Sequence, residues 1–357
     1  MSKIIFFILV LFFYSSSLTA QQWETSSLID RFSNEVIYDI GFGNGRIWIL
    51  SEFGLYSVET ERIITYKFDK NTKGLMDNFI SNINVNTDRN LFTRLMVDNN
   101  ILWLISNDLR TILKIQNDTI RNYTFDFHKD KNLIPLNVNS EKGQLWLFFS
   151  YYDDNKMQKD IYFLRDENFN KYSLGEDFSK IKLFFVLNGF KFMVYETELY
   201  SSVKIDYFIK MIPEDSLTLI TFNKNSNIEH NFQYTHDSGE IYILSSDSTL
   251  LRISLLKSSL SSQIRNIRIN YPLSLNVHFL VKGYYMYISS FDGIIQINID
   301  NNESFLLKPL DFSKNCFTGF DKLKLKDNKV WAIYGNGLKY KCDMDRYGFA
   351  VVNLTDR

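Results

Sequence analysis

Residues 45–59, GRIWILSEFGLYSVE, decide the fold of this chain. A run of β-forming residues is centred on Trp48, a polar turn carries Gly54, and a second apolar run covers residues 55–58. Two such runs joined by a short turn that contains glycine are typical of a β-hairpin. The stretch therefore predicts two antiparallel strands, and the rest of the chain can be searched for the same pattern.

The aromatic-centred strand returns six more times. The seven anchors are Trp48 in RIWIL, Trp103 in ILWLI, Trp146 in QLWLF, Phe192 in FKFMV, Tyr242 in EIYIL, Tyr287 in YMYIS and Trp331 in KVWAI. The intervals between them are 55, 43, 46, 50, 45 and 44 residues. About 47 residues is the length of one four-stranded propeller blade. We predict an all-β fold, a β-propeller of seven four-stranded blades. Six or eight blades and an open β-solenoid are the alternatives, and a closed ring is favoured because its edges are short and protected.

Each unit can be filled out to four strands. The additional strands are expected at residues 36–42 and 62–68 in the first unit, and at residues 323–326, 338–340 and 349–354 in the last. Seven such units would use nearly all of the chain that follows residue 20. We therefore expect a single propeller domain over residues 21–357.

The first twenty residues have the pattern of an export signal. Lys3 precedes an apolar run over residues 4–14, and three serines and then Ala20 follow. A positive start, a short apolar core and a small-residue exit indicate a cleavable signal peptide. A membrane-spanning helix, the alternative, needs roughly twenty apolar residues. We expect a signal peptide at residues 1–20, a mature chain that starts near Gln21 or Gln22, and a periplasmic or extracellular location.

Composition narrows the class of partner. The chain has 40 basic and 41 acidic residues and no basic run, whereas nucleic-acid binding needs a concentrated positive face. No segment after residue 20 is apolar for long enough to span a bilayer. The 31 Phe and 21 Tyr are spread along the chain and suit strands. We expect no nucleic-acid partner and no membrane span in the mature chain.

Motifs that would indicate catalysis are weak. The four histidines are His128, His230, His236 and His278, and none lies in H-E-x-x-H; no G-x-S-x-G motif is present either. Residues 290–293, SFDG, begin like the Asp-box of sialidases but lack its tryptophan, so we interpret them as a turn in which Gly293 takes a positive φ. We expect no catalytic residue, no cofactor and no metal.

Strand parity places a candidate binding rim. In an antiparallel four-stranded blade, the turn between strands two and three and the connector to the next blade lie at the same end. Two long excursions fall there: the connector over residues 69–82, with Asp77 and Asn78, and the loop expected over residues 150–159. The second carries, as candidate binding residues, Tyr151, Tyr152, Asp153 and Asp154. Aromatic and acidic groups together could stack on a sugar or hold a protein partner. A solvated turn is the alternative.

The same parity separates the two cysteines. Cys316 is expected before the first strand of the last blade, and Cys342 at the far end of its third strand. A strand of five or six residues spans roughly 17–20 Å, whereas bridged Cα atoms lie less than about 7 Å apart. We predict no disulfide bond.

Two stretches resemble a known family, the two-component-regulator propellers. Their repeat reads roughly G-x-I-W-I-G-T-x-x-G-L-Y, and the residues that match it are Gly45, Ile47, Trp48, Ile49, Gly54, Leu55 and Tyr56. Residues 73–80, KGLMDNFI, are similar to the family's inter-blade segment G-L-x-x-N-x-I. Such propellers form periplasmic sensor halves of hybrid histidine kinases and also occur as secreted proteins, chiefly in Bacteroidota. The resemblance implies a secreted or periplasmic propeller.

Three functions remain open on the sequence alone. The leading hypothesis is a non-catalytic binding or scaffold module for a glycan or an envelope protein. The second is a carbohydrate-active enzyme, a glycosidase or lyase, which would need carboxylates or a His–Tyr pair at the centre of the ring. The third is a sensor component that works with a separate membrane kinase.

Overall fold

The chain is described here from a computed structural model. The described residues are 27–32, 35–52, 54–59, 62–67, 92–117, 119–173, 178–197, 204–212, 216–223, 232–245, 248–254, 261–267, 269, 277–308, 320–334 and 348–354. The predicted signal peptide, Asp77, Asn78 and both cysteines lie outside them. Within the described part of the chain, no helix is long and apolar enough to cross a membrane.

The described strands form seven separate antiparallel sheets. The first three sheets contain β1 (Ile37–Gly43), β2 (Arg46–Ser51), β3 (Gly54–Glu59) and β4 (Arg62–Lys67); β5 (Phe92–Asp98), β6 (Ile101–Ser106), β7 (Thr111–Gln116) and β8 (Thr119–Thr124); and β9 (Ile134–Glu141), β10 (Gln144–Asp153), β11 (Lys156–Arg165) and β12 (Asn168–Lys171). The next two contain β13 (Ile181–Leu187), β14 (Phe190–Thr197), β15 (Lys204–Ile212) and β16 (Ser216–Asn223); and β17 (Phe232–Asp237), β18 (Glu240–Ser245), β19 (Thr249–Ser254) and β20 (Ser261–Asn266). The last two contain β21 (Phe279–Lys282), β22 (Tyr285–Ser290), β23 (Gly293–Asn298) and β24 (Ser304–Leu307); and β25 (Phe320–Lys326), β26 (Lys329–Tyr334) and β27 (Gly348–Asn353).

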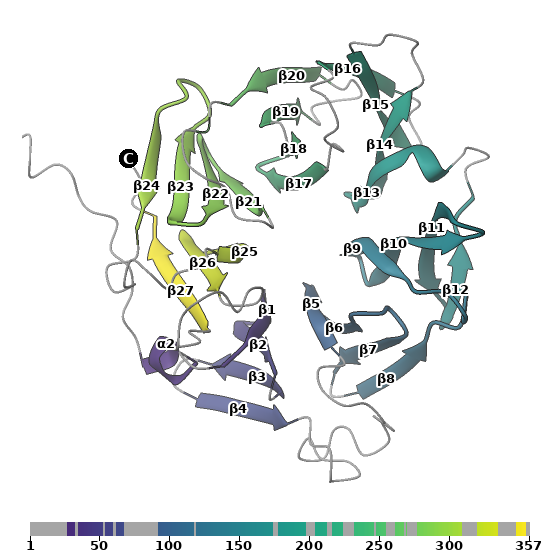
Figure 1. Ribbon diagram of the computed structural model, residues 1–357. Helices are drawn as coiled ribbons and strands as arrows, with labels where there is room; N and C mark the ends of the chain where they lie inside the picture. Colours follow the sequence, from purple (N-terminus) through teal and green to yellow (C-terminus); the bar gives the residue numbers. More distant parts are fainter. Residues whose placement is uncertain are drawn as a thin grey trace, which may run out of the picture.

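These sheets stand in a ring with the first strand of each nearest the centre (Figure 1). The only helices of the described residues are short, α2 (Ser27–Arg31) and the 3-10 turn η1 (Phe178–Lys180). The predicted β-propeller is thereby confirmed, whereas the count of seven blades for the whole chain stays a prediction. Every aromatic anchor lies in the second strand of its sheet: β2, β6, β10, β14, β18, β22 or β26.

Two-residue turns explain why the first and second strands form hairpins. Asn44 and Gly45 both have positive φ, 57° and 70°, and so do Asn188 and Gly189, at 54° and 84°. Two successive positive φ angles define the type I′ turn, whose twist matches that of the paired strands, and Asn-Gly is its preferred sequence. Local sequence therefore sets the register of these hairpins.

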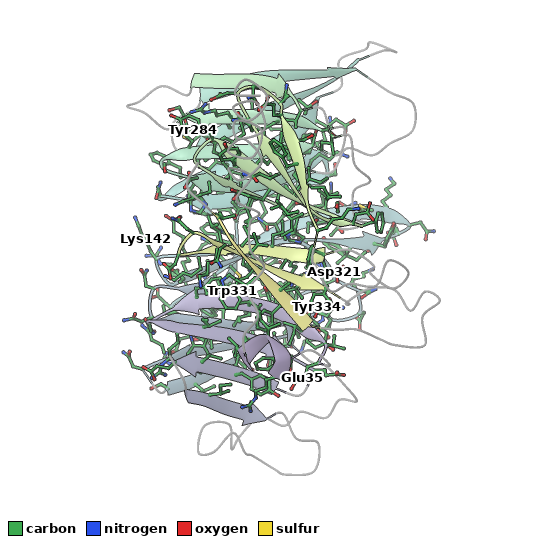
Figure 2. The ribbon with its side chains drawn as sticks, turned by 90° about the vertical axis from the view of Figure 1, so that its left-hand side faces the viewer. Glu35, Lys142, Tyr284, Asp321, Trp331 and Tyr334 are labelled. Carbon is green, nitrogen blue, oxygen red and sulfur yellow. The ribbon has the colours of Figure 1, made fainter. Side chains whose placement is uncertain are left out.

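The two ends of the ring carry different connections (Figure 2). Lys142 and Tyr284 lie in turns between first and second strands, on the left of this view, and we call that side of the ring the lower face. Glu35 and Asp321 lie at or just before the start of first strands, on the opposite side, and we call that side the upper face. The parity argument from the sequence holds: turns between second and third strands share the upper face with the connectors between sheets.

Apolar side chains fill the spaces between neighbouring sheets, and one such cluster closes the ring. It joins Ile49 of the first sheet to Trp331 and Phe349 of the last. Phe32, which follows α2, is fully buried in this cluster, with its ring 4.8 Å from Tyr56 and 6.0 Å from Phe349. The start of the described chain is thus packed against its end.

The last sheet differs from the sequence prediction. Its third described strand is β27, in which Val351 pairs with the anchor Trp331, so the segment expected at residues 349–354 lies directly beside β26 and not one strand further out, and residues 338–340 were expected in that place. Those three residues lie outside the described part of the chain. Gly348 opens β27 at a φ of 144°, and Gly293 opens the third strand β23 at 152°, as expected for its turn. The Gly-Leu pair at 337–338 gives the same sequence signal at the usual turn length, which is why residues 349–354 were expected one strand further from the centre.

Polar contacts at the lower face tie neighbouring sheets together. A carboxylate at the end of a first strand accepts a hydrogen bond from a glycine N–H in the next sheet's turn: Asp98 from Gly143 at 2.6 Å, Glu141 from Gly189 at 2.7 Å, and Asp237 from Gly283 at 2.9 Å. Bonds to a charged acceptor contribute about 1.5–3 kcal/mol each. They fix the relative position of successive sheets.

Candidate functional site

The four candidate rim residues that the structure describes lie on one hairpin at the upper face. Tyr151, Tyr152 and Asp153 belong to β10, and Asp154 forms a two-residue turn with Asn155 at φ angles of 47° and 61°. The prediction of a long loop over residues 150–159 is therefore wrong. The polar run that suggested a loop instead continues the ladder, and β10 and β11 are both ten residues long.

Tyr151 lies behind the rim rather than on it. Its side chain is 8% exposed and stacks on His128 with ring centroids 4.1 Å apart. The hydroxyl donates a hydrogen bond to Asp160 at 3.2 Å. Burial and the nearby Asp160 carboxylate raise the pKa of Tyr151 to about 12, so the phenol stays protonated. Tyr151 supports the hairpin from inside.

Asp160 of β11 organises this part of the rim. The buried carboxylate is bonded to Tyr151, lies 3.0 Å from His128 Nε2 and lies 2.7 Å from Lys171 Nζ. Neighbouring Lys159 reaches the next sheet, where its Nζ donates to the carbonyl of Ile181 at 2.8 Å. A buried carboxylate with this many partners holds its surroundings in one arrangement.

A second clamp holds the connector that faces the hairpin. The guanidinium of Arg110 donates to the carbonyl oxygens of Phe125, Phe127, His128, Lys129 and Lys131, at 2.6 to 3.3 Å. Lys131 in turn pairs with Asp153 at 2.7 Å. The connector between the second and third sheets is thereby fixed to the hairpin.

The register of this hairpin with the neighbouring strand β9 places three exposed apolar side chains on one face of the sheet. Tyr152 pairs with Met157, while Ser150, two residues before Tyr152, pairs with Ile134. Paired residues and residues two apart share a face of a sheet. Tyr152 is 55% exposed, and Met157 and Ile134 are each 42% exposed. We call Ile134, Tyr152 and Met157 the rim patch.

A polar inner wall surrounds the centre of the ring. Each sheet has one residue that lies nine positions before its anchor, in the first strand or just before it. This residue is paired with, or hydrogen-bonded to, the residue two positions after the anchor. The seven residues are Asp39, Arg94, Asn137, Leu183, Gln233, His278 and Lys322. In five sheets a register shift falls immediately before this position. Such bulges re-aim the side chain that follows. We call these seven residues the inner wall.

The charged members of the inner wall gather where the ring closes. Asp39 of the first sheet lies 3.3 Å from Lys322 and 3.1 Å from Lys324 of the last. It also accepts the N–H of Leu95 in the second sheet at 3.1 Å. Burial alone would raise the pKa of Asp39, but the two lysines and this hydrogen bond outweigh it and lower the pKa to about 2. Asp39 is therefore charged and joins three sheets.

Sequence reasoning missed this wall, although one signal was available. Six of the seven residues nine positions before the anchors are polar, at a place where a core strand would carry apolar residues. Aligning the repeats on their anchors and examining that column would have exposed it. Which charges meet, however, depends on closure of the ring.

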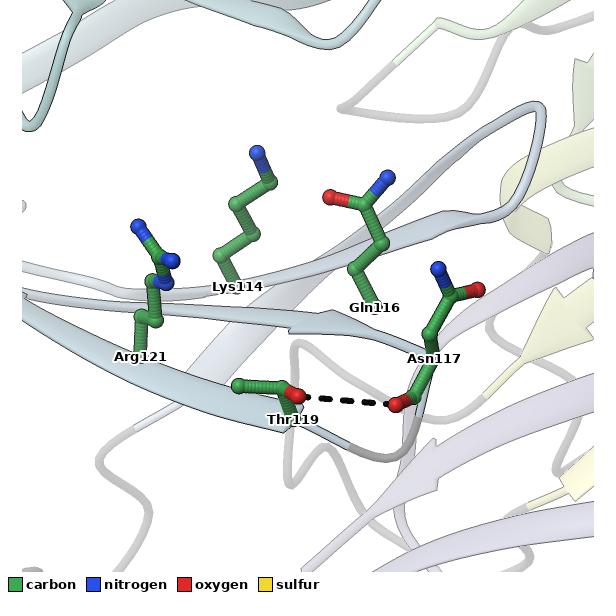
Figure 3. A pocket seen from close by; sticks show the side chains of 5 residues that line it. All are labelled: Lys114, Gln116, Asn117, Thr119 and Arg121. Atoms are coloured by element: carbon green, nitrogen blue, oxygen red, sulfur yellow. Dashed lines mark hydrogen bonds between the residues drawn. The ribbon is translucent and has the colours of Figure 1, made fainter.

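A shallow pocket on the lower outer side is less favourable as a site (Figure 3). It is lined by Lys114, Gln116, Asn117, Thr119 and Arg121, all from the β7–β8 hairpin. Lys114 lies over the ring of Trp103 at 5.4 Å, and Arg121 pairs with Glu167. Both cations are thus already engaged.

The carboxylates or His–Tyr pair that catalysis would need at the centre of the ring can be compared with the side chains that lie there. Asp39 is the carboxylate of the inner wall, and both of its oxygens contact lysines. The stacked His128–Tyr151 pair lies at the rim, where Tyr151 belongs to the cluster between the second and third sheets. No group of three or more potential metal ligands occurs within the described ranges.

Comparison with known proteins gives structural neighbours only. No protein-family model matches the chain, and no curated protein matches it. Two structures of the extracellular domain of BT4673 from B. thetaiotaomicron are similar, one described as a one-component and the other as a hybrid two-component system. They match 93% of this chain with TM-scores of 0.56 and 0.53, at 15% and 14% identity.

The chain spans only 40% and 39% of those two BT4673 chains. YCF48 bound to D1 peptide is similar over 95% of this chain and 97% of its own length, with a TM-score of 0.53 and 11% identity. Likeness at such low identity concerns the fold alone. It agrees with the resemblance to two-component-regulator propellers at that level, and the chain has a β-propeller fold.

Proposed function

We propose that the protein is an exported, non-catalytic binding module that holds a protein partner against the rim patch. The observation that carries the proposal is the β10–β11 hairpin, which together with the start of β9 exposes Tyr152, Met157 and Ile134 on one face of the sheet. Tyrosine and methionine are enriched in the contact regions of protein interfaces. The partner proposed is an envelope protein; a glycan is the competing ligand.

Rigidity of the hairpin supports this role. Asp160 and Arg110 fix the hairpin and its connector through the contacts described above. A surface that is already ordered loses little side-chain and loop entropy on binding, and that entropy otherwise costs about 0.5–1.5 kcal/mol per immobilised side chain. The rim patch is therefore suited to binding without rearrangement.

The structural neighbours support a binding role in general terms. YCF48 is a propeller that was determined with a bound peptide, and the BT4673 domains are extracellular. Neither identifies the partner of this chain. Export rests on the signal-like residues 1–20, and cleavage after them remains part of the proposal.

The test is capture of partners from an envelope fraction by the purified mature protein. The variant combines Tyr152→Ala with Met157→Ala, and the matched control is Tyr284→Ala, because Tyr284 is 68% exposed on the lower face. We expect loss of at least tenfold in affinity for the captured protein in the rim variant and none in the control, since buried interface anchors contribute about 2 kcal/mol or more.

Equal capture by both variants would refute the rim patch as the contact surface. A glycan array probed with the same three proteins distinguishes the competing ligand. Binding to a glycan that the rim variant loses would replace the protein partner by a sugar.

A sensor component beside a separate membrane kinase is the second candidate. The likeness in fold to the BT4673 extracellular domains, together with the repeat at residues 45–59, favours it. In that case the captured partner would be the periplasmic part of a kinase, and the rim variant would lose its effect on phosphorylation of that kinase.

A further inference from the structure

The inner wall carries more positive than negative charge where the ring closes. Lys322 and Lys324 of β25 and Arg94 of β5 surround Asp39, the only carboxylate among the described residues that contacts these lysines. His278 adds no further positive charge, because burial, and then the two lysines, lower its pKa to about 4. Within the described part of the chain, three cations therefore share this one anion.

Asp39 has no acceptor position left for the third cation. Its Oδ1 accepts from the N–H of Ile40 at 3.0 Å and contacts Lys324, while its Oδ2 accepts from the N–H of Leu95 at 3.1 Å and contacts Lys322. Arg94 Nη1 is buried and has no hydrogen-bond partner. A buried donor without an acceptor destabilises the folded state, and more so when it is charged.

The surplus of positive charge also affects the cations themselves. Burial lowers the pKa of Lys322, and repulsion from Lys324 and Arg94 lowers it further, against the opposing effect of Asp39. Burial likewise lowers the pKa of Arg94. Among the described residues, the cluster thus has three positive charges against one negative charge, and Nη1 of the guanidinium has no acceptor.

We propose that this part of the inner wall binds a small oxyanion, a carboxylate or phosphate group, through Arg94 together with Lys322 and Lys324. The guanidinium donates in a planar fork that suits either group. The bound anion would satisfy Nη1 and reduce the surplus of positive charge around Asp39. This site is independent of the rim patch, which is built from β9, β10 and β11.

The experiment measures binding of inorganic phosphate and of acetate to the mature protein, by calorimetry and by thermal unfolding. Ionic strength is held constant with sodium chloride. We expect saturable binding and a rise in Tm of roughly 4 °C at one hundred times Kd. Binding of phosphate alone, acetate alone or both supports the site and identifies the group it prefers.

Two variants and a matched control locate the binding. Arg94→Met and Lys324→Met should each weaken the affinity at least tenfold, and Lys324 is the less buried of the two lysines, which protects the fold. Lys326→Met is the control, because Lys326 lies on the same strand but faces Asp327 at the surface. Absence of binding to the unaltered protein, or equal binding by all variants, would overturn the proposal.

Discussion

Single side chains on the inner wall show how burial changes the chemistry of a residue. His278 lies just before β21, where its backbone N–H donates a hydrogen bond to Ser289 Oγ at 2.8 Å. Lys322, Lys324 and Asp39 are the charged groups that act on its imidazole. The histidine is therefore neutral in the folded protein at pH values where an exposed histidine would already be protonated.

We expect the free energy of unfolding to fall as the pH drops from about 6.5 to about 4. Over that range the unfolded chain binds a proton at residue 278 that the folded chain does not, because the folded pKa is about 4 against an ordinary 6.5. The loss attributable to this group is roughly 3 kcal/mol. Urea unfolding at pH 7.5, 5.5 and 4.5 measures it, and His278→Gln should flatten the decline. An unchanged slope in that variant would show that other groups cause it.

For strands and turns, the sequence predicted the hairpins correctly but misplaced some strand boundaries. The apolar spacing around Trp48 and the Asn44-Gly45 turn are local, so hairpins could be predicted from them. Residues 150–159, at the tip of the β10–β11 hairpin, were expected to form a loop because many of them are polar. Backbone pairing between the two strands nevertheless continues through this polar stretch. In the last sheet, the described strand that pairs with β26 begins at Gly348, and only the pairing of the folded sheet shows this.

Glycine at the start of a third strand gives the prediction at this level. A Cβ on Gly293 would lie 2.3 Å from the carbonyl oxygen of Leu307, and its φ of 152° disfavours any other residue. We expect Gly293→Ala to destabilise the protein by about 2–4 kcal/mol, since both a backbone clash and strain must be relieved. The control is Gly45→Ala, whose Cβ meets nothing within 4 Å and which costs only about 1 kcal/mol for its positive φ. Chemical denaturation compares them; equal losses would contradict the clash.

At the scale of the whole molecule, closure of the ring determines which charged residues meet, and the sequence alone could not predict these pairs. Asp39 and Lys322 are far apart in the chain, and no spacing rule pairs them. The propeller itself followed from the repeat of the anchors, because each unit alone is too small to bury its apolar faces. The rim hairpin could be located by parity, but its exposed face depends on the register of β10 with β9 and β11.

Phe32 provides the test of closure. Its fully buried ring fills the space between the first and last sheets. We expect Phe32→Ala to lower the free energy of unfolding by about 3–5 kcal/mol, the usual cost of removing a buried phenylalanine. Phe305→Ala, at an exposed position on β24, should change it by less than about 1 kcal/mol. Thermal and urea unfolding give both values, and a small effect at Phe32 would mean that the ring closes without it.

The pairing of Asp39 with two lysines of the last sheet has a consequence for biosynthesis. During translation Asp39 is made nearly three hundred residues before Lys322 and Lys324, so its ion pairs cannot form until the last sheet has been synthesised. A chain shortened before β25 would therefore leave the aspartate of its first sheet without these two counter-ions.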